Sequence, residues 1–213
     1  MKSARVAVLL LLGALLASPA FAQDGRDPLM RLEKTARYSI EVLMDSARLM
    51  SLPTRPIESK VLEGLSKNKP PRLILAVARN MFRSLRDARA VLGPGATDDE
   101  LTAAATALNV GVTPTELAQL ARTRQDKQAH EKKLTVPLVV LVDLISRGVP
   151  RDTASQTIYQ LWQRGAADDE LMGLWRGVER DIVSGADPGA ALLNRAREVP
   201  SRGPPPVSPP RPE

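Results

Sequence analysis

Four arginines share one face of a predicted helix and are the residues best placed to bind an anion. Arg72, Arg79, Arg83 and Arg86 recur at intervals of seven, four and three residues, which places them on one stripe of an α-helix. Residues 55–89 hold nine basic and three acidic residues. Guanidinium groups bind phosphate and carboxylate well, so this stripe is a candidate site for anionic polymers or lipid headgroups. We favour the alternative of a solvated face, whose arginine stems cover neighbouring apolar surface.

Two carboxylate clusters have the residue types of a metal site or an acid–base pair. They are Asp98-Asp99-Glu100 and Asp168-Asp169-Glu170. A calcium loop needs alternating oxygen ligands and a glycine for its turn, and neither cluster has that spacing. Acidic residues in the first turn of a helix satisfy free amides and complement the helix dipole. We therefore expect both clusters to cap helices, and we predict no metal site in them.

The residues that most catalytic sites need are missing from the sequence. His130 is the only histidine and there is no cysteine, so the usual zinc site cannot form. No nucleophile elbow, phosphate loop or dinucleotide fingerprint occurs. An enzyme would depend on carboxylates alone, as glycoside hydrolases do, and nothing singles out one of Glu33, Glu41, Glu58 and Glu63. We predict a protein that is not an enzyme, with no catalytic residues, cofactor or metal.

Three aromatic residues, Tyr159, Trp162 and Trp175, are candidates for a binding surface. Exposed aromatic rings often carry much of the binding energy of an interface. Tyr159 and Trp162 lie three residues apart and Trp175 falls on the next predicted helix, so packing across a hairpin is the interpretation we favour. Single-strand binders need stacking aromatics among their basic residues. Only Phe82 lies in the basic region, and we predict no specific nucleic-acid binding.

The first 22 residues have the three parts of a secretory signal peptide. Lys2 and Arg5 supply positive charge, residues 6–16 form an apolar run, and Ala20-Phe21-Ala22 is a cleavage site. The run is too short to span a bilayer, and no later apolar run is longer, so we expect no transmembrane segment after cleavage. We predict an exported protein, periplasmic or extracellular, in which the lack of cysteine excludes disulfides.

Apolar residues recur every three or four positions through most of the remaining chain, which is the period of an amphipathic helix. The clearest stripe comprises Ile74, Val77, Met81, Leu85, Ala88 and Leu92. An earlier helix is predicted to open at Asp27 and Pro28. Residues 134–148 are apolar enough for a strand. Thr135 as cap, Pro137 in the first turn and Gly148 as stop favour a helix at the centre of the core instead.

A glycine-led motif recurs at residues 95–101, 111–117 and 165–171, and in shorter form at 148–151 and 185–188. Its glycine is expected to end one helix in the left-handed conformation. The small apolar residue that follows is expected to pack into the core. The next helix then begins at a capping box, formed by Thr97 with Glu100 and by Thr113 with Glu116. Ala167 takes the threonine position in the third copy, so we expect a weaker cap there.

The spacing of these glycines predicts a repeated helical hairpin. Gly111, Gly148 and Gly185 lie 37 residues apart, with Gly165 close to midway in the second interval. Periods of this length are typical of helical arrays. Residues 69–72, Lys-Pro-Pro-Arg, are interpreted as a decayed copy of residues 148–151.

The fold class that these patterns predict is all-α: a bundle or short superhelix of helical hairpins joined by glycine caps. Residues 23–199 are expected to form the helical domain, with longer helices in 27–92 and short repeats in 95–198. Residues 200–213 contain seven prolines, which prevent a helix. We expect a disordered, polyproline-like tail there.

Together these features predict an exported, non-enzymatic interaction or scaffold protein of the bacterial cell envelope, with a protein partner. Repeated helical hairpins make extended binding surfaces, and a proline-rich tail suits docking. The first alternative is a protein that binds an anionic envelope polymer or lipid through the arginine stripe. A carboxylate-dependent glycan hydrolase is the weaker alternative.

Overall fold

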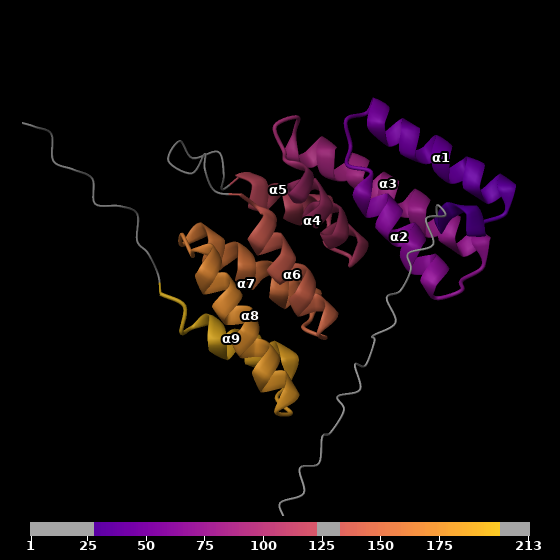
Figure 1. Ribbon diagram of the computed structural model, residues 1–213. Coiled ribbons are helices and arrows are strands. Elements are labelled where there is room, and N and C mark those ends of the chain that lie inside the picture. The colour runs from indigo at the N-terminus through magenta and orange to yellow at the C-terminus, as the bar shows by residue number, and fades with distance from the viewer. Residues whose placement is uncertain (1–27, 123–132, 201–213) are drawn as a thin grey trace, which may run out of the picture.

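The helical periodicity of the sequence is realised as helices, which confirms the all-α fold class. The computed structural model describes residues 28–122 and 133–200, and over these residues the chain forms a short 3₁₀ helix and nine α-helices, with no strand (Figure 1). The predicted signal peptide and residues 201–213 of the predicted tail lie outside the described residues. In chain order the elements are η1 (Pro28–Arg31), α1 (Lys34–Leu49), α2 (Arg55–Ser66), α3 (Pro71–Leu92), α4 (Asp98–Asn109), α5 (Pro114–Arg122), α6 (Thr135–Ser146), α7 (Arg151–Gln163), α8 (Asp168–Val183) and α9 (Pro188–Ala196).

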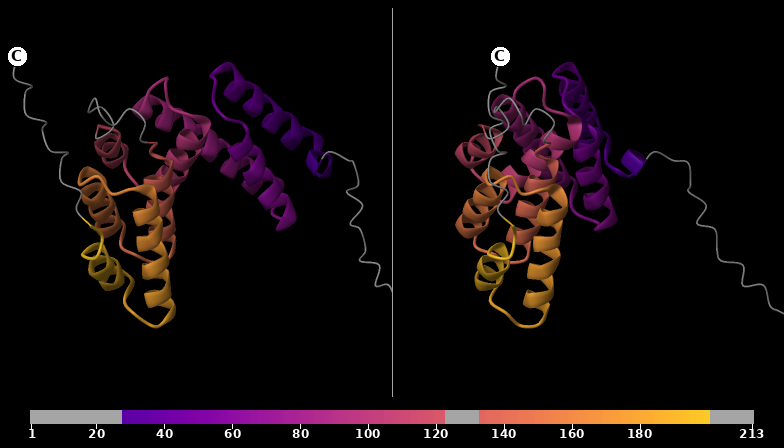
Figure 2. Two further views of the ribbon diagram at one scale, coloured as in Figure 1. Left: turned by 60° about the vertical axis from the view of Figure 1, so that its left-hand side comes forward. Right: turned by 90° about the vertical axis from the view of Figure 1, so that its left-hand side faces the viewer.

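The helices form two layers in which a helix packs against the helix two places further along the chain. In the odd-numbered layer α1 contacts α3, α3 contacts α5, α5 contacts α7, and α7 contacts α9. In the even-numbered layer α4 contacts α6 and α6 contacts α8. Figures 1 and 2 show the helices progressing from α1 at one end of the molecule to α9 at the other. The contacts therefore follow the order of the hairpins, as in a short superhelix.

The core lies between the two layers and is built from leucine and isoleucine. The largest fully buried side chains are Ile40, Ile57, Leu85, Leu101, Leu117, Leu120, Leu134, Leu138, Leu141, Leu144, Ile158 and Leu171. The apolar segment at 134–148 is a helix, as predicted, and α6 lies centrally, since it contacts α4, α7 and α8. Its predicted cap is wrong. Leu134 holds the N-cap position, and the buried hydroxyl of Thr135 has no hydrogen-bond partner among the described residues.

The predicted glycine turns are confirmed at four positions. Gly111, Gly148, Gly165 and Gly185 all have positive φ. In each turn the amide after the glycine donates back to the helix that has just ended, for example from Val112 to the Ala107 carbonyl at 3.0 Å. This is the Schellman motif. In the first copy the Gly-Pro-Gly sequence at 93–95 stops α3, as its residue types predict, and Gly93, with φ +82°, ends the helix instead of Gly95 of the recurring motif.

The same turn also occurs without glycine. Asn68 has φ +49°, and the Lys69 amide donates to the Gly64 carbonyl at 2.9 Å. Pro70 then caps α3, as Pro150 caps α7. Residues 68–71 therefore correspond to residues 148–151, one position earlier than the predicted copy at 69–72. Ser51 makes a further copy with φ +52°. Asparagine and serine are common outside such turns, so they indicate this turn less clearly than glycine does. The repeated pattern is therefore weaker in the first half of the sequence.

The helix starts agree in part with the predicted caps. Glu100 and Glu116 each complete a capping box, with Thr97 and Thr113 respectively. At α8 only half of the box remains, since Glu170 accepts from the Ala167 amide and alanine offers no acceptor in return. The helix predicted to open at Asp27 and Pro28 begins as the 3₁₀ helix η1 at Pro28, and the first α-helix begins only at Lys34. Asp27 itself lies outside the described residues.

Candidate binding groove

A groove lies between α2, α3 and the end of α4, with a cavity of about 390 Å³. Its α2 wall contains Lys60, Glu63, Gly64 and Lys67. Its floor is α3, and Asn109 of α4 closes the far end. The remaining lining residues are Lys69, Leu73, Ile74, Val77, Asn80 and Met81. This volume falls within the usual range of ligand pockets.

The groove exists because the even-numbered layer is interrupted. Helix α4 packs on α6 and α6 packs on α8, but α2 makes no contact of that extent with α4. Instead α2 packs tightly on α3. A Cβ at Gly64 would lie 2.7 Å from Cγ1 of Ile74, so only glycine allows this approach. The groove is therefore the place where a packing partner is missing in an otherwise regular stack.

The floor of the groove is apolar and open. Leu73 is 49% exposed and Val77 is 46% exposed, whereas Ile74 and Met81 beside them are buried. Val77 belongs to the apolar stripe that periodicity assigns to the core, so the sequence prediction for this residue is wrong. The physical reason is that α2 makes no extensive contact with α4, so the described residues leave this part of α3 about half exposed.

A small polar cluster fixes the end of the groove beside α4. The Asn80 amide donates to Oδ1 of Asn109 at 2.6 Å, and the Ser84 hydroxyl donates to the same oxygen at 2.8 Å. The Asn109 amide in turn points to Sδ of Met81 at 3.9 Å. These bonds tie the last residue of α4 to the middle of α3, so this end of the groove is preorganised.

The rim of the groove carries positive charge. Lys60 and Lys67 pair with the two carboxylate oxygens of Glu63, at 2.8 and 2.6 Å. The hydrogen bond from Lys60, followed by that from Lys67, lowers the pKa of Glu63 to about 2. Lys69 forms no ion pair within the described residues. The rim therefore carries three ammonium groups and one carboxylate, and its net charge is positive.

The arginine stripe lies on the outer face of α3. Arg72, Arg79, Arg83 and Arg86 are all exposed, and none of them forms an ion pair within the described residues. Only Arg83 has a side-chain contact of note, a 3.5 Å hydrogen bond to Oδ1 of Asn80. The structure therefore brings the four residues together on one surface, as predicted. Whether that surface binds an anion stays a prediction.

Arg89, a fifth arginine on α3, has a structural role. Its guanidinium donates to the carbonyl oxygens of Pro94 and Ala96, at 2.9 and 3.3 Å, and to that of Ser51 at 2.8 Å. It thus joins the turn after α3 to the turn after α1. Sequence reasoning missed this contact because Ser51 lies 38 residues away.

The three predicted aromatic residues do not form one exposed surface. Trp162 is only 4% exposed and belongs to the core, so it is excluded from a binding surface. Trp175 is half-buried, and its buried indole N–H has no hydrogen-bond partner among the described residues. Tyr159 is half-buried and accepts a hydrogen bond from Gln163 at 2.6 Å. It also lines a smaller cavity of about 260 Å³ between α5, α6 and α7.

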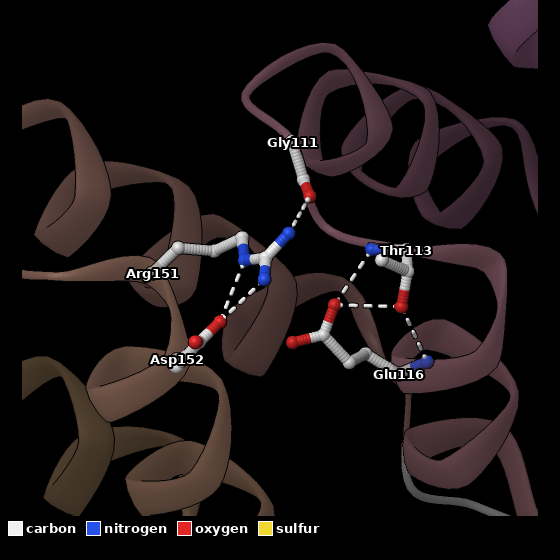
Figure 3. Close-up of polar contacts among 5 residues, drawn as sticks. All are labelled: Gly111, Thr113, Glu116, Arg151 and Asp152. Atoms are coloured by element: carbon white, nitrogen blue, oxygen red, sulfur yellow. Dashed lines mark hydrogen bonds and ion pairs between the residues drawn. The ribbon is translucent and has the colours of Figure 1, made fainter.

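Glu116 lines this smaller cavity and forms part of the capping box at the start of α5. Its carboxylate accepts from the amide and the hydroxyl of Thr113, both at 2.7 Å (Figure 3). Burial raises the pKa of Glu116, but the hydrogen bonds from Thr113 and the charge of Arg151 outweigh it, and the net pKa is below the usual value. Arg151 itself pairs with its neighbour Asp152. The carboxylates of Glu116 and Asp152 are thus both held by contacts that are local in the chain.

The two carboxylate clusters are placed at helix starts. Glu100 is 2% exposed, and its second oxygen accepts from the Leu134 amide at 3.0 Å.

Over residues 28–122 and 133–200 no group of three His, Cys, Asp or Glu side chains could hold a metal ion. In the same part of the chain no helix is long and apolar enough to cross a membrane. His130 lies outside the described residues.

Comparison with known proteins gives no family. No protein-family model, curated protein or solved structure matches the chain.

Proposed function

We propose that this chain is an exported, non-enzymatic interaction protein of the bacterial cell envelope, and that it binds a partner protein through the groove on α3. The observation that carries the proposal is the open apolar floor at Leu73 and Val77, where the helix stack is interrupted. Export is supported by the signal-peptide pattern of residues 1–22. The periplasm or the exterior of the cell is therefore the proposed location.

The groove has the composition of a protein interface. Interfaces combine an apolar centre, which excludes water, with a polar rim. Here Leu73 and Val77 are the centre, and Lys60, Lys67 and Lys69 stand at the rim. Each exposed apolar side chain that a partner covered would contribute about 25 cal/mol per Å² of buried area. The walls are held by ion pairs and by the Asn109 cluster, so little ordering is needed on binding.

The absence of catalysis is part of the proposal and is supported by the placement of the carboxylates. Glu100, Glu116 and Glu170 each accept an amide at a helix start. Glu63 is held by two lysines. A general acid needs a raised pKa, and the pKa of Glu63 is lowered instead.

A second candidate function is binding of an anionic envelope polymer or lipid through the arginine stripe. The observation in its favour is that Arg72, Arg79, Arg83 and Arg86 are exposed together and form no ion pair in the described residues. Such binding should weaken steeply with salt. It should also be lost in an Arg79→Glu, Arg83→Glu double variant and be retained when Val77 is changed.

The test is chemical crosslinking of the mature protein in its native envelope, followed by mass spectrometry. Three proteins are compared: the wild type, Val77→Asp, and the control Val183→Asp. Val183 is 77% exposed at the far end of the array, so the control introduces the same charge outside the groove. The proposal expects one discrete partner that is captured by the wild type and the control and lost with Val77→Asp. Equal capture by all three would contradict it.

A further inference from the structure

We propose that the occupant of the groove is an acidic amphipathic helix of the partner protein. The inference rests on the proposed function of the groove and adds the shape and the charge of what binds there. Two observations carry it: the helical spacing of the open floor, and the excess of lysine around it.

The shape of the groove fits a helix. Leu73, Val77 and Asn80 recur at four and three residues along α3, so the floor is a straight trough parallel to the helix axis. A partner helix can place residues at i, i+3, i+4 and i+7 along such a trough. Elsewhere in the array the equivalent surfaces are covered by helices, because α4 packs on α6 and α6 on α8. A partner helix would thus continue the even-numbered layer where α2 leaves it.

The openness of the trough argues against a buried acyl chain. Leu73 and Val77 are each about half exposed, at 49% and 46%, so the floor is a surface and not a tunnel. A hydrocarbon chain in this position would keep much of its own surface in water. A helix, in contrast, presents its apolar side to the floor and its polar side to solvent.

The charge of the rim selects an acidic partner. Lys60, Lys67 and Lys69 surround the floor, and Glu63 is the only carboxylate among the lining residues. Carboxylates that flank an apolar stripe would meet these ammonium groups, whereas a basic helix would be repelled. The C-terminal segment of this chain is unsuitable as an occupant, because residues 200–213 contain Arg202 and Arg211 against the single acid Glu213.

Glu63 has a defined role in this arrangement. Its carboxylate holds Lys60 at 2.8 Å and Lys67 at 2.6 Å, so it occupies the position that a partner carboxylate would take. An incoming acidic side chain must compete with it for the same two ammonium groups. Removing the charge of Glu63 should therefore strengthen binding, which is a result that a merely structural role would not produce.

The experiment uses three synthetic helical peptides with one apolar stripe in common and with Glu, Gln or Lys on both flanks. Binding to the mature protein is measured by fluorescence anisotropy at two salt concentrations. We expect the Glu peptide to bind at least tenfold more tightly than the Gln peptide, the Lys peptide not to bind, and the affinity of the Glu peptide to fall with salt.

Four variants, each checked for an unchanged helical circular-dichroism spectrum, locate the contact. Val77→Asp and Lys69→Glu should each lower the affinity for the Glu peptide at least tenfold. Arg79→Glu makes the same charge change outside the groove and should have an effect of less than threefold. Glu63→Gln should tighten binding about fivefold, because it releases two lysines from exposed ion pairs.

Several outcomes would overturn the inference. They are no binding of the Glu peptide, equal binding of the Glu and Lys peptides, and equal losses with Lys69→Glu and Arg79→Glu. Binding of anionic phospholipid vesicles that depends on Val77 and Lys69, without peptide binding, would show that the ligand is a lipid. If envelope capture depends on Val77 but the captured segment is not acidic, the proposed function stands and this inference fails. If no capture depends on Val77, the proposed function fails as well.

Discussion

The guanidinium of Arg151 donates a 3.1 Å hydrogen bond to the carbonyl oxygen of Gly111, 40 residues earlier in the chain (Figure 3). Gly111 stands in the turn of one hairpin and Arg151 follows the turn of the next. The packing of the side chain on the turn glycine, without the hydrogen bond, recurs one repeat later, where Pro188 lies against Gly148. A Cβ would be 3.8 Å from the neighbouring side chain at both glycines. Both pairs are related by the 37-residue period, so the turns stack as regularly as the helices do.

The first prediction concerns the turn glycines. Gly148 has φ +91°, and a non-glycine residue in the left-handed region costs about 1–2 kcal/mol. Gly148→Ala should therefore lower the free energy of unfolding by about that amount. Gly173 is the matched control, because it lies inside α8 with open space around it. Gly173→Ala should stabilise by about 0.5–1 kcal/mol, and urea denaturation measures both changes. A loss of stability in both variants would contradict the turn assignment.

The second prediction concerns Glu100. Its carboxylate accepts from the Thr97 amide and from the Leu134 amide of the following hairpin, both at 3.0 Å. Glu100→Ala leaves two N–H groups without their acceptor, and each buried one costs about 1–3 kcal/mol. We expect a loss of about 2–4 kcal/mol. Glu116→Ala removes a comparable cap whose carboxylate accepts from Thr113, three residues earlier in the chain, and should cost about 1 kcal/mol. Equal losses would show that the contact with Leu134 contributes nothing.

The third prediction concerns Asp143. Burial, together with the nearby Glu179, raises its pKa, and Arg147 opposes this only in part. The spacing of Asp143 and Arg147, one helical turn apart, predicts an ion pair between them. In the structure Arg147 pairs with Glu179 of α8 instead. A carboxyl whose pKa is higher in the folded state binds its proton more tightly there, so stability falls as pH rises through that pKa. Asp143→Asn should therefore be more stable than the wild type at pH 7 and lose that advantage below pH 3.8, the ordinary pKa of the group.

Thermal denaturation of Asp143→Asn and the wild type between pH 3 and pH 7 checks this sign. A variant that is less stable than the wild type at pH 7 would show that the charge of Asp143 is favourable in the fold. The partner change Arg147→Gln serves as a control, because it removes the favourable charge and should make the wild-type carboxyl more destabilising.

The helices and most of their turns could be predicted from the sequence, because the patterns that indicate them are local. Helix period, capping boxes and the 37-residue glycine spacing depend on residues close in the chain, and these predictions agree with the structure at Gly111, Gly148, Thr97 and Thr113. Asn68 and Ser51 make the same turn with residue types that are common elsewhere. The repeat could therefore be recognised only faintly in the first half of the chain.

The groove could not be predicted in the same way. Periodicity assigns Val77 to the apolar face of α3, but it does not say which neighbouring helix covers that face. The lack of an extensive contact between α2 and α4 is a property of the packing of whole helices. The arginine stripe, in contrast, required only helical spacing and was predicted residue by residue. Packing across a hairpin was the favoured interpretation of the aromatic residues, and Trp162 is buried, as that interpretation expects.

The most direct test of the account is site-specific photo-crosslinking in the native envelope. A photoreactive amino acid replaces Val77 in the groove, and the controls replace Leu49 on α1 or Val183 on α8, which are 88% and 77% exposed. We expect position 77 alone to crosslink one partner protein, at one helical segment rich in Asp and Glu. Crosslinks from position 49 or 183 with none from position 77 would contradict the groove as the binding site.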